Sequence, residues 1–83
     1  LSLNLSDTNI TDVSALGNVH TLKLSSCHNL TDVSALGNVH TLNLYNCRIT
    51  DVGALGNVHT LDLSDTNITD IRALKNVNNL ILE

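Results

Sequence analysis

Thr-Asp-Val-Ser-Ala-Leu-Gly-Asn-Val-His-Thr-Leu occupies residues 11–22 and recurs without change at residues 31–42. The same phrase returns at 50–61 with one glycine in place of a serine, and in a more altered form at 69–80. The copies begin 20, 19 and 19 residues apart. A period of this size is typical of a solenoid, in which each repeat forms one coil and rests on its neighbours. We therefore expect the repeated phrase to build a scaffold and any function to lie where the copies differ.

The composition favours a thin stack of coils over a compact globule. The 83 residues include one tyrosine and no Phe, Trp, Met or Pro, so Leu, Val, Ile and Ala supply nearly all the apolar mass. A small globular core normally uses aromatic side chains to fill its centre. Stacked layers need only aliphatic side chains of one size. No apolar run approaches the roughly 18 residues of a membrane span, and we expect no membrane interaction.

Aligned on their Leu-x-Leu pairs, the copies define a single domain over residues 1–83. The repeats cover 1–19, 20–39, 40–58 and 59–77, with a partial repeat at 78–83, and we expect a fragment of a longer array. Each pair alternates apolar and polar residues, as a short half-buried strand does. Inward residues then recur every third position, as at Val13, Leu16 and Val19, which predicts 3-10 turns. The pair Gly17-Asn18 is suited to a tight corner before the next strand.

This pattern resembles a known family. Val19-x-x-Leu22-x-Leu24-x-x-Cys27-x-x-Leu30 is similar to the leucine-rich repeat, with one extra residue before the last leucine. The resemblance implies an α/β-type solenoid of short parallel strands and 3-10 or irregular convex turns. The solenoid would wind as a right-handed superhelix and form a segment of a horseshoe.

Two narrower resemblances follow. The Ile-Thr-Asp-Val-Ser-Ala-Leu stretch resembles the convex segment of bacterial internalin-type repeats. Residues 36–44 resemble the short-period repeats of Marseilleviridae giant-virus proteins, such as those of Noumeavirus. The viral resemblance implies a virus-encoded protein that binds a host or viral partner.

The net charge of −4 is distributed in a way that argues against nucleic-acid binding. One aspartate in the same slot of each repeat accounts for it, and the other four acids are matched in number by four bases. Phosphate recognition needs clustered Lys and Arg, which the variable positions lack. The aspartates are placed to accept from free amides of the convex turn, and a calcium-binding row is the alternative interpretation. They are Asp12, Asp32, Asp51 and Asp70.

Two further rows could carry chemistry. Cys27 and Cys47 share a slot on adjacent coils, which predicts buried, reduced thiols, with a disulfide as the alternative. His20, His40 and His59 form a row before the strands, which we interpret as a structural ladder at the strand entry. Zinc binding is the alternative there, but parallel side chains from one slot do not converge on a tetrahedral centre. We expect no metal, cofactor or catalytic site, because no nucleophile and base stand apart from the repeats.

The cellular compartment is addressed by two weak signals. Four Asn-x-Ser/Thr sequons are present, but three arise from the repeat phrase itself. Cysteines without an evident partner favour a reducing environment. We therefore expect an intracellular location (the host cytoplasm) or the virion rather than secretion.

The outward positions of the predicted strands vary from coil to coil, and Tyr45 is the only aromatic residue among them. Tyrosine is favoured at interface hot spots because it brings contact area and a hydrogen bond at low entropic cost. The alternative is that small polar rows only keep an exposed sheet soluble. The predicted partner-binding residues on this concave face are Asn4, Lys23, Ser25, Thr41, Asn43, Tyr45, Asp62 and Ser64.

Three functions are compatible with this pattern. The first is a non-catalytic protein–protein interaction module that binds a host or viral protein through the concave face. The second is a structural or virion repeat protein without a specific ligand, which the near-identity of the copies favours. The third is a ubiquitin-ligase-type adaptor, because residues 27–32 resemble the turns of cysteine-bearing repeats that accompany an F-box. Uncapped ends would also allow self-association.

Overall fold

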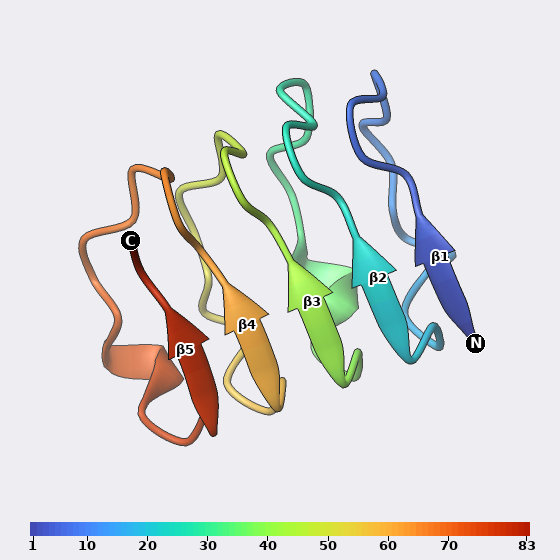
Figure 1. Cartoon of the computed structure of the whole chain (residues 1–83). Helices are drawn as coiled ribbons and strands as arrows, with labels where there is room; N and C mark the ends of the chain where they lie inside the picture. Colours follow the sequence, from blue (N-terminus) through green and yellow to red (C-terminus); the bar gives the residue numbers. More distant parts are fainter.

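The computed structural model describes residues 1–83 as a solenoid built on one parallel sheet. The strands follow one another in the order β1-β2-β3-β4-β5, so each strand pairs with the strand of the next coil. Figure 1 shows them side by side, with the returning segments behind. This arrangement confirms the predicted fold class. The strands are β1 (Ser2–Asn4), β2 (Thr21–Lys23), β3 (Thr41–Asn43), β4 (Thr60–Asp62) and β5 (Asn79–Ile81).

The register of the sheet places equivalent residues of successive repeats beside one another. Leu22 of β2 pairs with Leu3 of β1 and with Leu42 of β3. Because side chains alternate between the two faces of a strand, these leucines point into the coil and their neighbours point out. Leu22 and Leu42 are buried, whereas Lys23 is exposed.

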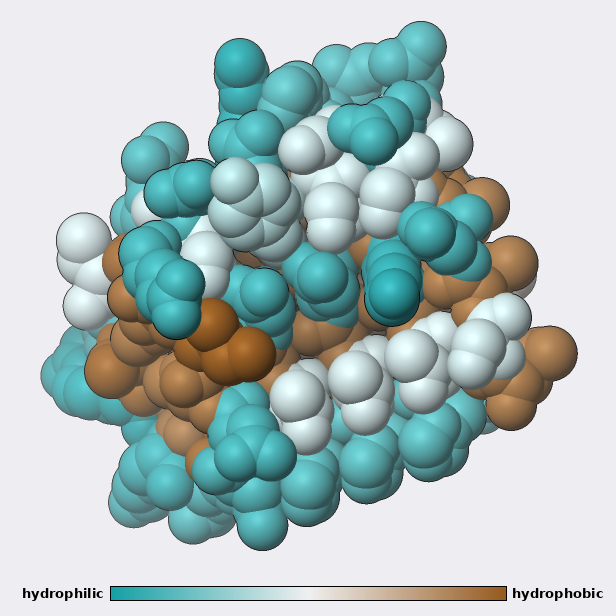
Figure 2. All heavy atoms as spheres, in the orientation of Figure 1, coloured by the Kyte–Doolittle hydropathy of each residue, from teal (hydrophilic) through white to brown (hydrophobic).

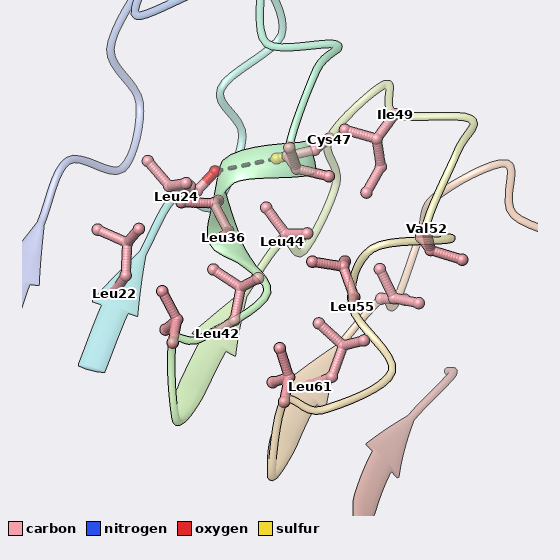
Figure 3. Close-up of a cluster of buried hydrophobic side chains, with 14 of the residues drawn as sticks. Leu22, Leu24, Leu36, Leu42, Leu44, Cys47, Ile49, Val52, Leu55 and Leu61 are labelled. Carbon is pink, nitrogen blue, oxygen red and sulfur yellow. Dashed lines mark hydrogen bonds between the residues drawn. The ribbon is translucent and has the colours of Figure 1, made fainter. Parts of the chain in front are cut away.

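The core is a continuous column of aliphatic side chains inside the coils. Nineteen buried residues form one cluster, and seven partly buried residues pack against it. Figure 3 shows leucines of successive coils, such as Leu22, Leu42 and Leu61, in the same relative place. The terminal coils are less covered, because Leu3 and Leu80 each have a neighbouring strand on one side only.

The convex side is made of short turns with 3-10 hydrogen bonding. Two of them are regular enough to form helices, η1 (Ser34–Leu36) and η2 (Arg72–Leu74). The other two coils make the same bonds from residue i+3 to residue i, for example from the Leu16 N–H to the Val13 carbonyl at 3.0 Å. The predicted spacing-three turns are therefore confirmed. No helix of the structure has the length and apolar character needed to cross a membrane.

The glycine of the repeated phrase serves a purpose that the sequence analysis did not predict. No glycine has a positive φ, so the expected corner conformation is not what requires it. A Cβ at Gly37 would lie only 2.6 Å from the carbonyl oxygen of Ala54 in the next coil. At Gly17 the corresponding distance, to the oxygen of Ala35, is 2.7 Å. Glycine is needed here because successive coils approach too closely for any side chain.

The left-handed positions lie elsewhere, in the turn that follows each strand. Each of these residues is polar, and Asn and Asp tolerate this conformation better than most residues because their side chains bond to the nearby backbone. Serine at this position is the least suited of the set. The residues are Asp7, Ser26, Asn46 and Asp65, with φ angles of 61°, 58°, 58° and 57°.

We predict that Gly37→Ala destabilises the protein by about 1–3 kcal/mol, because the added methyl group must push two backbones apart. Gly53→Ala is the matched control. Its Cβ would meet only a flexible carboxylate oxygen of Asp51 at 3.1 Å, and serine stands in this slot in the first two copies. The control should change the free energy of unfolding by no more than about 0.5 kcal/mol. Urea denaturation of both variants measures the difference, and equal effects would show that coil spacing does not select the glycine.

Candidate interaction surface

The outward positions of the strands, with the residues that follow them, form one surface, here called the sheet face. In Figure 2 the middle of this face is polar, and apolar surface gathers at the two ends of the stack. Seven of the eight predicted binding residues retain exposed surface. Asn4, Lys23 and Tyr45 are exposed, and Ser25, Thr41, Asn43 and Asp62 are half-buried.

Ser64 does not fit the prediction of an exposed contact residue. This residue is buried, with only 6% of its surface exposed. The hydroxyl oxygen accepts a hydrogen bond from the Glu83 N–H at 3.1 Å. The expectation of an outward, free side chain was wrong here because the following coil covers this serine and uses its oxygen.

The amide side chains and the carboxylate in the middle row of the sheet face are bonded to their own coil. In three coils the side-chain oxygen accepts a hydrogen bond from the backbone N–H two residues later. This contact satisfies an amide that would otherwise lack a protein partner as the chain leaves the strand. The bonds run from Ser6 N–H to Asn4 Oδ1 (3.0 Å), from Tyr45 N–H to Asn43 Oδ1 (2.9 Å) and from Ser64 N–H to Asp62 Oδ1 (2.9 Å).

Lys23 and Ile81 occupy the same row but have no oxygen to offer. In their coils the amide two residues later bonds instead to a serine hydroxyl of the preceding coil. Sequence reasoning missed this exchange, although a signal was present: a serine stands one coil before each residue that cannot accept. The bonds run from Ser25 N–H to Ser6 Oγ (3.1 Å) and from Glu83 N–H to Ser64 Oγ (3.1 Å).

Lys23 and Tyr45 are the predicted binding residues with the greatest freedom to contact a partner. Tyr45 is 40% exposed. No serine is required at its position, because the backbone amide in the next coil that would need one already bonds to Asp62 of its own coil. A hydrogen bond to the Asp65 carboxylate raises the pKa of the Tyr45 hydroxyl. Beside Lys23 lies a shallow hollow of about 190 Å³, lined also by residues of β1.

We predict that Asn43→Ala lowers the free energy of unfolding by about 0.5–2 kcal/mol, as loss of a side-chain cap on an amide usually does. Asn43→Asp should retain stability, because Asp62 makes the same bond in the next coil. Lys23→Ala, at the position paired with Asn43 in the sheet, should change stability by less than about 0.5 kcal/mol. Urea denaturation compares the three variants. Equal losses for Asn43→Ala and Lys23→Ala would contradict the division into bonded and free residues.

The two cysteines join neighbouring coils through hydrogen bonds. Both are buried free thiols, in agreement with the prediction. The Cys47 thiol donates to the Leu24 carbonyl oxygen of the preceding coil at 2.9 Å (Figure 3), and the Cys27 thiol donates in the same way to Leu5 at 3.2 Å. Thr8 stands in the same slot but donates to Leu5 within its own coil. The cysteines therefore stabilise the contact between coils.

We predict that Cys47 is unreactive toward a thiol reagent in the folded protein. Burial raises the pKa of its thiol, and the thiolate is the reactive form. The rate of reaction with Ellman's reagent should be lower than that of the urea-unfolded chain by more than about tenfold. The Cys27→Ala variant isolates the signal of Cys47, and fast labelling of this folded variant would show that the thiol is accessible.

The convex aspartates are used by the turns in which they lie. In each repeat the Oδ1 atom accepts from the backbone N–H two residues later, for example from Ser14 to Asp12 at 2.9 Å. Hydrogen bonds from Ser14 lower the pKa of Asp12, and a side-chain hydrogen bond from Arg72 lowers that of Asp70. Arg72 Nη2 also lies 2.7 Å from Asp70 Oδ2. No three His, Cys, Asp or Glu side chains are grouped so that they could hold a metal ion.

Comparison with known families agrees with this architecture. A family model described as leucine-rich repeats (2 copies) matches residues 37–76, and a second leucine-rich-repeat model matches residues 1–17. Together with the parallel sheet and the repeated core, these matches show that the chain has the leucine-rich-repeat fold. No curated protein matches the chain.

Two solved structures extend the comparison. An internalin (inlF) from Listeria monocytogenes superposes with a TM-score of 0.77 and 27% identity, over 96% of this chain and 27% of that one. An internalin C2 (inlC2) from the same organism gives a TM-score of 0.54 and 20% identity, over 99% of this chain and 51% of that one. The chain thus spans about a quarter and about half of the two proteins. Solenoids of this class generally act as non-catalytic scaffolds for protein interaction.

Proposed function

We propose that this chain binds another protein through its sheet face, with Lys23 and Tyr45 as the main contact residues. The observation that supports the proposal is the contrast within this face. Asn4, Asn43 and Asp62 are bonded to the scaffold, whereas Tyr45 leaves much of its ring exposed. The Tyr45 hydroxyl interacts with the Asp65 carboxylate, but the exposed part of the side chain is available for a partner.

The rigidity of the sheet favours binding by these side chains. The amides behind them are satisfied by neighbouring side chains or coils, so little backbone ordering is left to occur on association. Tyr45 has only two rotatable side-chain bonds and supplies both apolar area and a hydroxyl group. Lys23 is the one basic residue in the three strand positions of the sheet face, and it suits a partner that presents an acidic group.

The origin of the partner is proposed from the sequence resemblance alone. The resemblance of the short-period phrase to the repeats of Marseilleviridae proteins supports a virus-encoded module that acts on a host or viral protein. The similarity to internalins supports an interaction role for the fold.

We predict that Tyr45→Ala and Lys23→Glu each weaken binding to the partner by about tenfold or more, the effect expected for hot-spot residues. The immobilised chain is used to recover proteins from lysate, and each recovered protein is then purified and titrated by calorimetry. Lys75→Glu is the matched control, because it makes the same charge change at an exposed convex position.

The affinities of the three variants for each purified partner are compared with that of the wild type. Loss of affinity in both sheet-face variants, with wild-type affinity in Lys75→Glu, is the expected result. If every purified partner binds all three variants as it binds the wild type, the sheet face is not the binding site. Equal loss in Lys23→Glu and Lys75→Glu would indicate a nonspecific effect of charge and would contradict the role proposed for Lys23.

A further inference from the structure

Three histidines form a stack of parallel rings along the edge of the solenoid. The ring centroids of His20 and His40 lie 4.5 Å apart with an interplanar angle of 11°. Those of His40 and His59 also lie 4.5 Å apart, with an angle of 10°. The repeated phrase predicts the row, but not that the rings touch or how close they lie. The stack ends where Leu1 and Asn78 occupy the same slot.

Each ring is held in place by the threonine that follows it. The Nδ1 atom of His40 lies 2.9 Å from the Thr41 hydroxyl, and the same contact at His20 and at His59 measures 3.0 Å. A hydroxyl can donate to a neutral ring nitrogen or accept from a protonated one. The threonines therefore fix the orientation of the rings in both charge states and do not oppose protonation.

The histidine backbone also carries the start of the sheet. The His20 carbonyl oxygen accepts from the amides of His40 and Thr41 in the next coil, at 3.1 and 3.0 Å. The His40 carbonyl oxygen accepts from His59 and Thr60 at 2.9 and 3.0 Å. A force that separates the rings therefore acts directly on the hydrogen bonds that join the coils.

Protonation of the stack would create such a force. The charged groups that act on His40 are the neighbouring rings of His20 and His59, and no carboxylate is among them. A second positive charge in the stack lies next to a like charge whose ring centroid is 4.5 Å away, which is well within the distance over which salt screens charges. Neutral rings, by contrast, stack favourably.

We propose that the histidine stack makes this solenoid sensitive to pH, so that protons taken up by the row weaken the contact between the second, third and fourth strands. The inference stands apart from the proposed binding function. It predicts a loss of stability in mildly acidic conditions, before the carboxylates titrate. It also gives the repeated histidine a physical role beyond filling a slot.

The direction of the effect follows from proton linkage. Desolvation, together with the neighbouring histidines, lowers the pKa of His40 in the folded protein below its ordinary value of 6.5. The unfolded chain then binds a proton more readily than the folded chain. Stability is greatest above the unfolded pKa and is lost as the pH falls below it. Asp12, Asp32 and Asp70, with lowered pKa values, respond at lower pH.

The first test measures the pKa of His40 by NMR titration in the wild type and in the His20→Asn/His59→Asn double variant. Asparagine is chosen because Asn78 already occupies this slot. We expect the pKa of His40 to lie below about 6.5 in the wild type and to rise in the double variant. The same value in both proteins would overturn the proposal that the rings interact.

The second test compares urea midpoints at about pH 7.5 and about pH 5.5, a range in which histidine titrates. The wild-type midpoint should fall over this range, and the midpoint of the triple His→Asn variant of the row should fall by less than half as much. His28→Asn, outside the row, controls for the loss of a histidine as such. If the triple variant does not fold, His40→Asn alone serves, with a smaller fall than the wild type expected. An equal fall in the wild type and the row variants would overturn the proposal.

Discussion

The spacing between coils is the constraint on which the rest of this structure depends. Parallel backbone hydrogen bonds hold neighbouring strands about 4.8 Å apart, and every other contact between coils must fit that distance. The glycine of the repeated phrase is needed because a Cβ would lie 2.6 Å from the next backbone at Gly37. The histidine rings, 4.5 Å apart, stack because their coils are joined at this spacing.

The same constraint explains why identical residues can be repeated in one slot. A leucine that fits between two leucines in one coil fits again in the next, so a single aliphatic size fills the column. Polar rows obey a stricter rule, because each amide that leaves a strand needs an acceptor. Asn43 supplies that acceptor from its own coil, while Ser6 supplies it to the coil that follows. The variation along the sheet face is thus partly a record of how the amides are satisfied.

Much of the fold could be predicted from the sequence, and less of the candidate site. The period of the repeats and the position of residues such as Leu22 indicate strands and core, because burial selects residue type directly. The bonds made by Asn43 and the burial of Ser64 could not be read in this way, since an asparagine or serine suits an exposed position equally well. Only the folded structure shows that Asn43 accepts from an amide of its own coil and that Ser64 accepts from the coil that follows.

The sequence by itself determined the solenoid, its coil length and its parallel order, because a phrase repeated every 19 or 20 residues can bury its leucines only by stacking. The tertiary structure decided which outward residues remain free and how closely the coils approach. It also decided that His20, His40 and His59 meet ring to ring. These properties depend on distances between residues about twenty positions apart, which the alternation of apolar and polar letters does not encode.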